Sequence, residues 1–280
     1  MVVCVSLFHL FTFSPLTVEA KKHKQLVVIH TNDTHSTILP LNPNIDNKDL
    51  AGRGGFLRRI NMLKEQRSQH PDLLLFDSGD FSQGSGYYTL FKGEVEIGLM
   101  NQMGIDASTI GNHEFDFGLE NMAEQFKKAT FPILCANYDF TGTPVEGLTK
   151  PWIVIKRNGV KIGVFAVCPK MKGLVSDKNC KGVKYLDPAK VALETATMLK
   201  EQKKCDIVIC ISHLGWNSNR GEDDQYMIQN SRNIDLVLGG HTHTYMPQLE
   251  HWNNMDGKPV SVDQNGKSAC FVGKMVIDLK

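Results

Sequence analysis

Short apolar runs alternate with segments of helical periodicity along most of the chain. The apolar runs predict buried strands at 25–31, 73–76, 107–110, 133–136, 152–156, 161–167, 206–212, 234–238, 260–262 and 270–279. Apolar residues that recur every third or fourth position predict helices at 55–69, 93–103, 119–128 and 188–203. Asn158-Gly159, between two predicted strands, is a hairpin turn signal. The alternation predicts an α/β fold in a single domain.

Polar clusters begin where five of the predicted strands stop. The clusters start at Asp33, Asp80, Asn112, His213 and His241. Ligands of open α/β sheets bind beyond the carboxyl ends of the strands. Clusters that are far apart in the sequence can therefore meet in space, and the order of elements predicts a functional site built from these loops.

The clusters contain side chains that bind divalent metals. Asp33 and His35 are alternate residues, as are His241 and His243, and alternate residues of an extended chain share a face. A set of ligands with both nitrogen and oxygen donor atoms suits zinc, manganese or iron better than calcium or magnesium. The candidate ligands are two carboxylates, one amide and four imidazoles: Asp33, His35, Asp80, Asn112, His213, His241 and His243.

Composition changes this picture little. The chain has 280 residues, of which 41% are hydrophobic and 22% are charged, as in ordinary globular proteins. Lys and Arg together number 31 and Asp and Glu 30. No overall positive field would attract a nucleic acid polymer, so attraction of an anionic substrate must be local.

The N-terminus carries an apolar run, 2–18, that is followed by Ala20 and a basic stretch from Lys21. This pattern predicts that residues 1–20 are a secretory signal peptide, although no Lys or Arg precedes the run. A membrane anchor or a buried first strand are the alternatives. The run is short for a spanning helix, and Pro15 would interrupt one. We expect an exported protein with no stable membrane span after signal cleavage.

The cysteines show no metal-binding or redox spacing. None of the seven forms a CxxC pair. Cys135, Cys168 and Cys210 lie inside apolar runs, where a free thiol behaves as a small apolar side chain. We expect the cysteines that follow the signal to be mostly structural and activity to require no disulfide.

Five sequence blocks in fixed order carry a family resemblance. They are Thr31-Asn32-Asp33-Thr34-His35, Gly79-Asp80, Gly111-Asn112-His113-Glu114-Phe115-Asp116, His213 and Gly240-His241-Thr242-His243. The set resembles the calcineurin-like metallophosphoesterase superfamily and, more closely, the catalytic domain of the bacterial periplasmic 5'-nucleotidase family. The resemblance covers the chain from Gln25 onward. It implies a four-layer αββα sandwich, with two mixed β-sheets flanked by helices, over residues 21–280.

The resemblance also implies the roles of the metal ligands. Two divalent ions, zinc or manganese, would be bound. Asp80 would bridge them, and it is preferred over Asp77 because Gly79-Asp80 matches the family block. The ligand set of the first ion would be Asp33, His35 and His243, and that of the second Asn112, His213 and His241.

Other residues are expected to act on the substrate. His113 would lie near the leaving group, and Asp116 would hold its ring in one tautomer. Glu114 receives no ligand role. Asn112 would also contact the substrate, and Arg53, in the glycine-rich turn before a helix, is a weaker candidate for phosphate contact.

The implied activity is metal-dependent hydrolysis of phosphate esters, with 5'-nucleotides as the expected substrates and the periplasm as the expected location. A 2',3'-cyclic nucleotide phosphodiesterase or a UDP-sugar hydrolase are alternatives on the same site. Members of the resembled family have a C-terminal domain that binds the base, and this sequence ends at Lys280, after the closing strands. A separately encoded substrate-binding domain is therefore an expected partner. A metal-binding subunit that docks such a chain is the alternative of another class.

Overall fold

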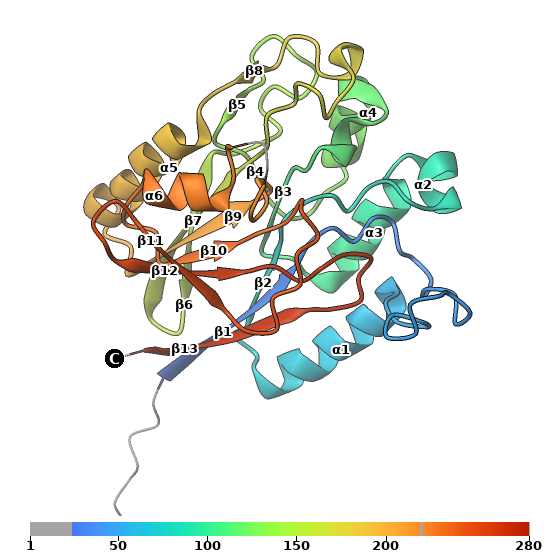
Figure 1. The fold of residues 1–280 in the computed structure, drawn as a ribbon, viewed down its shortest axis with the longest axis horizontal. Helices are drawn as coiled ribbons and strands as arrows, with labels where there is room; N and C mark the ends of the chain where they lie inside the picture. The colour runs from blue at the N-terminus through green and yellow to red at the C-terminus, as the bar shows by residue number, and fades with distance from the viewer. Residues whose placement is uncertain (1–23, 219–220, 280) are drawn as a thin grey trace, which may run out of the picture.

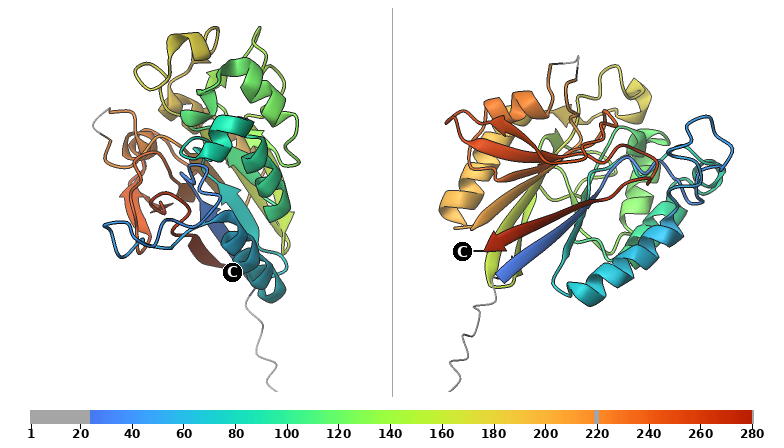
Figure 2. Two further views of the ribbon diagram at one scale, coloured as in Figure 1. Left: turned by 90° about the vertical axis from the view of Figure 1, so that its right-hand side faces the viewer. Right: turned by 60° about the horizontal axis from the view of Figure 1, so that its bottom comes forward.

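The computed structural model describes residues 24–218 and 221–279. Two mixed β-sheets pack face to face, and helices lie on the outer face of each sheet (Figures 1 and 2). The four-layer αββα prediction is confirmed. The signal peptide predicted for 1–20 lies outside the described residues. In the described ranges, no helix is both long and apolar enough to cross a membrane.

The first sheet has the strand order β13-β1-β2-β3-β4. Its strands β1 to β4 are parallel, and β13 pairs antiparallel with β1 at one edge. All these strands fall on predicted runs, although β13 starts three residues after the predicted start at 270. The strands are β1 (Lys24–Thr31), β2 (Leu74–Asp77), β3 (Ala107–Thr109), β4 (Ile133–Leu134) and β13 (Gly273–Leu279).

The second sheet has the order β11-β12-β10-β9-β7-β6. Its four inner strands are parallel, and both edge strands are antiparallel to their neighbours. Asn158-Gly159 forms the predicted hairpin turn between β6 and β7. The strands are β6 (Trp152–Arg157), β7 (Val160–Val167), β9 (Ile207–Ser212), β10 (Leu236–Leu238), β11 (Glu250–Asn253) and β12 (Pro259–Asp263). Two short strands, β5 (Tyr138–Asp139) and β8 (Lys184–Tyr185), pair separately.

Alternation along the strands builds three apolar layers. Val28 of β1 and Ile209 of β9 face the space between the sheets, whereas Ile29 and Cys210 face the two helical layers. Successive side chains of a strand point to opposite faces, so strands that are apolar on both faces must be covered on both faces. The helices are α1 (Phe56–Gln69), α2 (Gly86–Phe91), α3 (Glu94–Met103), α4 (Gly118–Phe126), α5 (Pro188–Thr197) and α6 (Asp224–Gln229).

The sequence pattern missed the short elements. Helices α2 and α6 span only six residues each, too few for a helical period to show. Both begin with a capping side chain, Ser85 for α2 and Asp223 for α6, which accepts main-chain N–H bonds of the first turn. The predicted helix 188–203 is α5 continued by a π-helical turn, Met198–Gln202.

Candidate metal centre

The loops that follow β1, β2, β3, β9 and β10 converge at the carboxyl ends of both sheets. The first sheet contributes Asp33, Asp80 and Asn112, and the second contributes His213 and His241. The main-chain N–H of His241 donates to both carboxylate oxygens of Asp33, at 3.1 and 2.9 Å. Residues more than 200 positions apart in sequence therefore meet at one place, because the packing of the two sheets brings the loops after β1 and β10 together.

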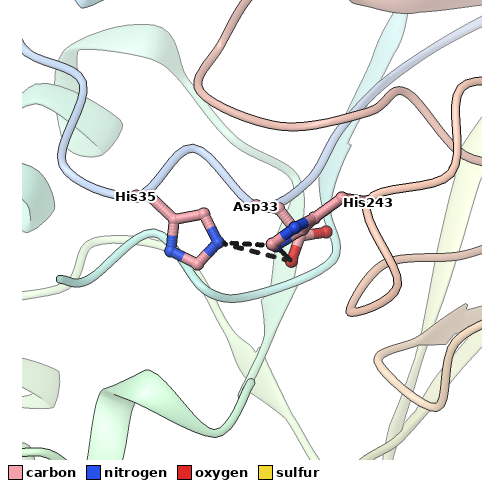
Figure 3. A group of neighbouring side chains, drawn as sticks. All are labelled: Asp33, His35 and His243. Atoms are coloured by element: carbon pink, nitrogen blue, oxygen red, sulfur yellow. Dashed lines mark hydrogen bonds and ion pairs between the residues drawn. The ribbon is translucent and has the colours of Figure 1, made fainter. Parts of the chain in front are cut away.

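One ligand group consists of Asp33, His35 and His243, whose ligand atoms lie within 4.8 Å of one another. The Nε2 atoms of His35 and His243 lie 2.9 Å apart (Figure 3). They lie 3.8 and 3.5 Å from Asp33 Oδ1, respectively. Two imidazole nitrogens and a carboxylate oxygen thus face a common point, an arrangement that fits a divalent cation.

A second group consists of Asp80, His213 and His241, with ligand atoms again within 4.8 Å. His213 Nε2 lies 3.1 Å from Asp80 Oδ2 and 3.9 Å from Asp33 Oδ1. Asp80 also forms a group with His35 and His113. The carboxylate of Asp80 therefore lies between the two groups, where a bridging ligand has to be.

The buried polar atoms of the donor set fit metal ions. Asn112 Oδ1 is buried without a hydrogen-bond partner among the described residues, which is costly unless a cation or water satisfies it. His213 Nδ1 lies 2.5 Å from the carbonyl oxygen of Ser78, an acceptor, so this nitrogen carries the proton. The lone pair of His213 Nε2 then faces two carboxylates, which is the arrangement of a metal-binding histidine.

Charge at the site is consistent with this interpretation. Burial alone would raise the pKa of Asp80, but the adjacent His213 holds that pKa below its ordinary value. Burial would lower the pKa of His213, yet the carboxylates of Asp80 and Asp33 raise it well above 6.5. The Asp80 carboxylate thus stays ionised, and positive charge is favoured at this position.

The backbone is unusual at the candidate ligands. Five of the seven have positive φ angles, a region that side-chain-bearing residues rarely adopt. Such angles cluster at functional sites when surrounding contacts enforce them. The residues are Asp33 (φ 46°), His35 (φ 44°), Asp80 (φ 50°), His241 (φ 73°) and His243 (φ 55°).

Glu114 holds two of the ligand loops together. Its buried carboxylate accepts the main-chain N–H groups of Asp80 (3.0 Å), Ser82 (3.1 Å) and Gly111 (2.6 Å). Burial and the charge of Asp80 raise the pKa of Glu114 to about 7. Gly111 is required at its position because a Cβ there would lie 2.1 Å from Asp80 Oδ1. Glu114 belongs to the same sequence block as His113, but its hydrogen-bond partners can be identified only in the folded structure.

His113 and Asp116 form the expected pair. His113 Nδ1 lies 3.0 Å from Asp116 Oδ2, and both side chains are about one third exposed, at 31% and 37%. The imidazole ring centres of His113 and His35 lie 5.4 Å apart. Burial lowers the pKa of His113, but the Asp116 hydrogen bond and the charges of Asp80 and Asp116 outweigh it and raise the pKa.

Two other predicted assignments have different outcomes. Asp77 is buried at the end of β2 and accepts hydrogen bonds from Thr31 Oγ1 (2.6 Å) and the main-chain N–H of Gly79 (3.1 Å). Asp77 belongs to none of the Asp and His groups found among the described residues, whereas Asp80 belongs to two. Arg53 is exposed and lies over the Phe271 ring, 5.5 Å from its centre. Its contact with phosphate stays a prediction.

Two buried polar residues near the centre were not singled out from the sequence. Asp224 is fully buried and lies 2.5 Å from Ser212 Oγ, next to His213. His30 is also buried, and its ring nitrogens lie 2.8 Å from Asp263 Oδ2 and 2.9 Å from Ser78 Oγ. Asp224 thus contacts the residue before His213, and His30 contacts the loop that carries Asp80.

Comparisons with known proteins agree with this geometry. Residues 26–245 match the family described as calcineurin-like phosphoesterase. The trifunctional nucleotide phosphoesterase YfkN of Bacillus subtilis is 29% identical over 89% of this chain and 18% of its own length. The 5'-nucleotidase of Rattus norvegicus is 31% identical over 80% of this chain and 39% of its own. A 5'-nucleotidase precursor of Thermus thermophilus has a TM-score of 0.82 and 25% identity, covering 92% and 52% of the two chains.

The fold and the converging Asp and His groups define a metallophosphoesterase. The chain belongs to the calcineurin-like phosphoesterase family and is homologous to the N-terminal part of 5'-nucleotidases. It spans about half the length of the Thermus structure and less of the two sequence relatives.

Proposed function

We propose that this chain hydrolyses phosphate monoesters of 5'-nucleotides at a centre of two divalent metal ions, either zinc or manganese. The observation that carries the proposal is the position of Asp80, whose carboxylate belongs to one group with His213 and His241 and to another with His35 and His113. A carboxylate between two ligand groups and beside a candidate acid is the arrangement that two-metal ester hydrolysis needs.

Each ion would have its own ligand set. Asp33, His35 and His243 would hold the first, and Asn112, His213 and His241 the second, with Asp80 shared by both. When bound, the ions would supply Lewis-acid stabilisation of the phosphoryl group and lower the pKa of a water molecule.

The remaining chemistry falls to side chains of the protein. His113 Nδ1 faces Asp116, which leaves Nε2 of the ring to donate a proton to the departing ester oxygen. Asp116 fixes the tautomer and favours the charged form of the ring. The amide of Asn112, the residue before His113, would contact the phosphoryl group and orient it.

A second candidate is cleavage of phosphodiesters or of the diphosphate in UDP-sugars. A cavity of about 310 Å³ next to His241 is lined by Lys170, Lys172 and Glu222, and Lys170 Nζ lies 3.6 Å from a Glu222 carboxylate oxygen. Lys172 offers positive charge there for a second phosphate group beside the centre. The relationship to a protein named a trifunctional nucleotide phosphoesterase also favours a range of nucleotide substrates.

The proposal includes export, supported by the apolar run before Ala20, and completion of the substrate site by a separately encoded domain.

The test is phosphate release by the metal-loaded protein from 5'-AMP, a 2',3'-cyclic nucleotide, a UDP-sugar and an aryl phosphate. Asp80→Asn serves as the background control. Turnover of 5'-AMP that is lost in the variant supports the nucleotidase. A preference for the cyclic nucleotide or UDP-sugar supports the second candidate. Absence of turnover with both ions bound contradicts both and favours a metal-binding subunit that docks another chain.

A further inference from the structure

The candidate ligands His35 and His213 differ in how their imidazole rings are oriented. A metal-binding histidine ordinarily donates the N–H of its second ring nitrogen to a carboxylate, a carbonyl oxygen or water. In His213 this nitrogen, Nδ1, faces the carbonyl oxygen of Ser78. Nδ1 of His35 is buried and has no hydrogen-bond partner among the described residues. The direction of His35 Nε2, which faces Asp33 and His243, therefore depends on the main chain that carries the ring (Figure 3).

This main chain has an unusual conformation at two successive residues. His35 and Ser36 have φ angles of 44° and 48°. Side chains disfavour this left-handed region, so the conformation persists only where other contacts enforce it. The main-chain N–H groups of the two residues donate to the carbonyl oxygens of Asp80 and Phe81 in the loop after β2, each at 2.9 Å. These bonds fix the main chain to one neighbouring loop, and the side chain of Ser36 fixes it to a second element.

The second element is α3, through Glu96 in its first turn. The Ser36 hydroxyl donates to Glu96 Oε1, and Ser36 Oγ lies 2.6 Å from Ser85 Oγ. Ser85 Oγ accepts main-chain N–H groups of the first turn of α2 as its cap. Because the Ser36 proton is donated to Glu96, the Ser85 hydroxyl donates to Ser36 Oγ. The two hydroxyls thus form one directed chain of hydrogen bonds that runs from α2 to α3 through the residue after His35.

Glu96 is an unusual residue type for a fully buried position. Its side chain is 0% exposed, and its Oε2 atom has no hydrogen-bond partner among the described residues. Glutamate is almost never fully buried without a charged partner, because loss of hydration costs stability. The dipole of α3 offsets part of this cost, because it favours negative charge in the first turn. An apolar side chain would be buried here at lower cost, so the carboxylate indicates a role in holding Ser36.

We propose that Glu96 is a positioning residue of the candidate metal centre, which acts through Ser36 to hold His35 in the direction that the first ion requires. The inference rests on the two-metal site of the proposed function and adds to it a residue that is not a ligand. Glu96 belongs to none of the Asp and His groups found among the described residues. Without this hydrogen bond the His35 ring has neither a partner at Nδ1 nor a restrained main chain, so the first ion is held more weakly.

Zinc affinity at the first ligand group tests this role without turnover. The metal-free protein is titrated by calorimetry in a His213→Ala background, in which the ligand group of the first ion stays complete. Ser36→Ala and Glu96→Ala are each expected to weaken zinc binding by about 10–100-fold, as loss of a residue that orients a ligand does. Glu96→Gln keeps an acceptor oxygen for the Ser36 hydroxyl and should retain most of the affinity.

A double variant and a matched buried serine separate positioning from a general loss of packing. Ser36→Ala and Glu96→Ala combined should weaken zinc binding no more than either change alone, because both break the same hydrogen bond. Ser108→Ala is the matched control. Ser108 is also fully buried, and its hydroxyl donates at 3.3 Å to Asp77, a carboxylate outside the ligand groups. This control should lower the Tm of the metal-free protein without changing its zinc affinity.

The same titration with His213 retained should show that Ser36→Ala weakens one of two zinc-binding steps and leaves the other unchanged. Equal weakening of both steps, unchanged affinity in Ser36→Ala, or an equal loss in Ser108→Ala would overturn the positioning role, even if the unchanged protein hydrolyses esters. The expected affinity losses without turnover of any ester by the unchanged protein would retain the role and reject the proposed function. Absence of zinc binding by the unchanged protein would reject both. If Glu96→Ala does not fold, Ser36→Ala decides, because it removes a single oxygen atom.

Discussion

The Nδ1 atom of His213 lies 2.5 Å from the main-chain oxygen of Ser78. This hydrogen bond joins the loop after β9, in one sheet, to the loop after β2, in the other. It fixes the imidazole tautomer so that the Nε2 lone pair faces Asp80 and Asp33. The orientation of a candidate metal ligand thus depends on the packing of the two sheets.

Removal of this imidazole should affect one ion more than the other. His213→Ala is expected to lower bound metal from about two ions per chain to about one, because Asp33, His35 and His243 remain as a separate group. Elemental analysis after dialysis measures this stoichiometry. Retention of both ions at the same affinity would contradict the assignment of His213 to the second site.

Loss of the candidate acid should depend on the leaving group. His113→Gln is expected to lower kcat for 5'-AMP by about 10²–10⁴. The loss should be smaller for 4-nitrophenyl phosphate, whose leaving group departs without a proton. Steady-state kinetics on both substrates checks this, with metal content measured in parallel. Equal losses for the two esters would reject proton donation by His113.

The pH profile should report the His113–Asp116 pair. The hydrogen bond and charge of Asp116 raise the pKa of His113. Activity that needs the protonated ring is present below this pKa and lost as pH rises through it. In Asp116→Asn the pKa is lower, so the alkaline loss of kcat should begin at lower pH. Asp139→Asn provides the control, because Asp139 is a half-buried residue of β5 that belongs to none of the Asp and His ligand groups. An unshifted alkaline limb would show that another group sets it.

Buried Asp224 should make stability depend on pH. Burial raises its pKa from 3.8 to about 7. The folded state therefore holds a proton that the unfolded chain releases, and this contribution to stability is lost as pH rises from about 4 to about 7. Between pH 5 and 8 the Tm of the metal-free protein should fall by about 2–4 °C or more beyond that of Asp224→Asn. Parallel pH dependences of the two proteins in thermal unfolding would refute this.

Mild reduction should leave activity unchanged while the metals are retained. The cysteines in the described ranges are free. Cys135 and Cys168 are buried with their sulfur atoms 3.5 Å apart, too far for a bond but close enough for a packing contact. Phosphate release before and after treatment with a non-chelating reductant measures the effect. A loss of activity at constant metal content would show that a disulfide is needed.

The sequence determined the elements with a clear period and the chemistry of the candidate site. Strands such as β1, β7 and β9 are apolar on both faces, so their patterns identify them without long-range information. The candidate metal-binding residues could be identified because each block follows the end of a strand, where α/β folds form their binding sites. The metal and catalytic roles of these residues stay predictions until they are measured.

Only the tertiary structure decided which residues support the centre. Glu114 has its N–H partners because the loops after β2 and β3 lie together. Asp224 has its hydroxyl partner because the start of α6 lies against the end of β9. The segments 35–42 and 84–91 line one cavity and are in contact through Ser36 and Ser85, and α2 is too short for its period to be recognised from sequence. Hydrophobic periodicity indicates which face of a segment is buried. Which other element covers that face is determined by the packing of whole sheets and helices, and no local sequence pattern contains that information.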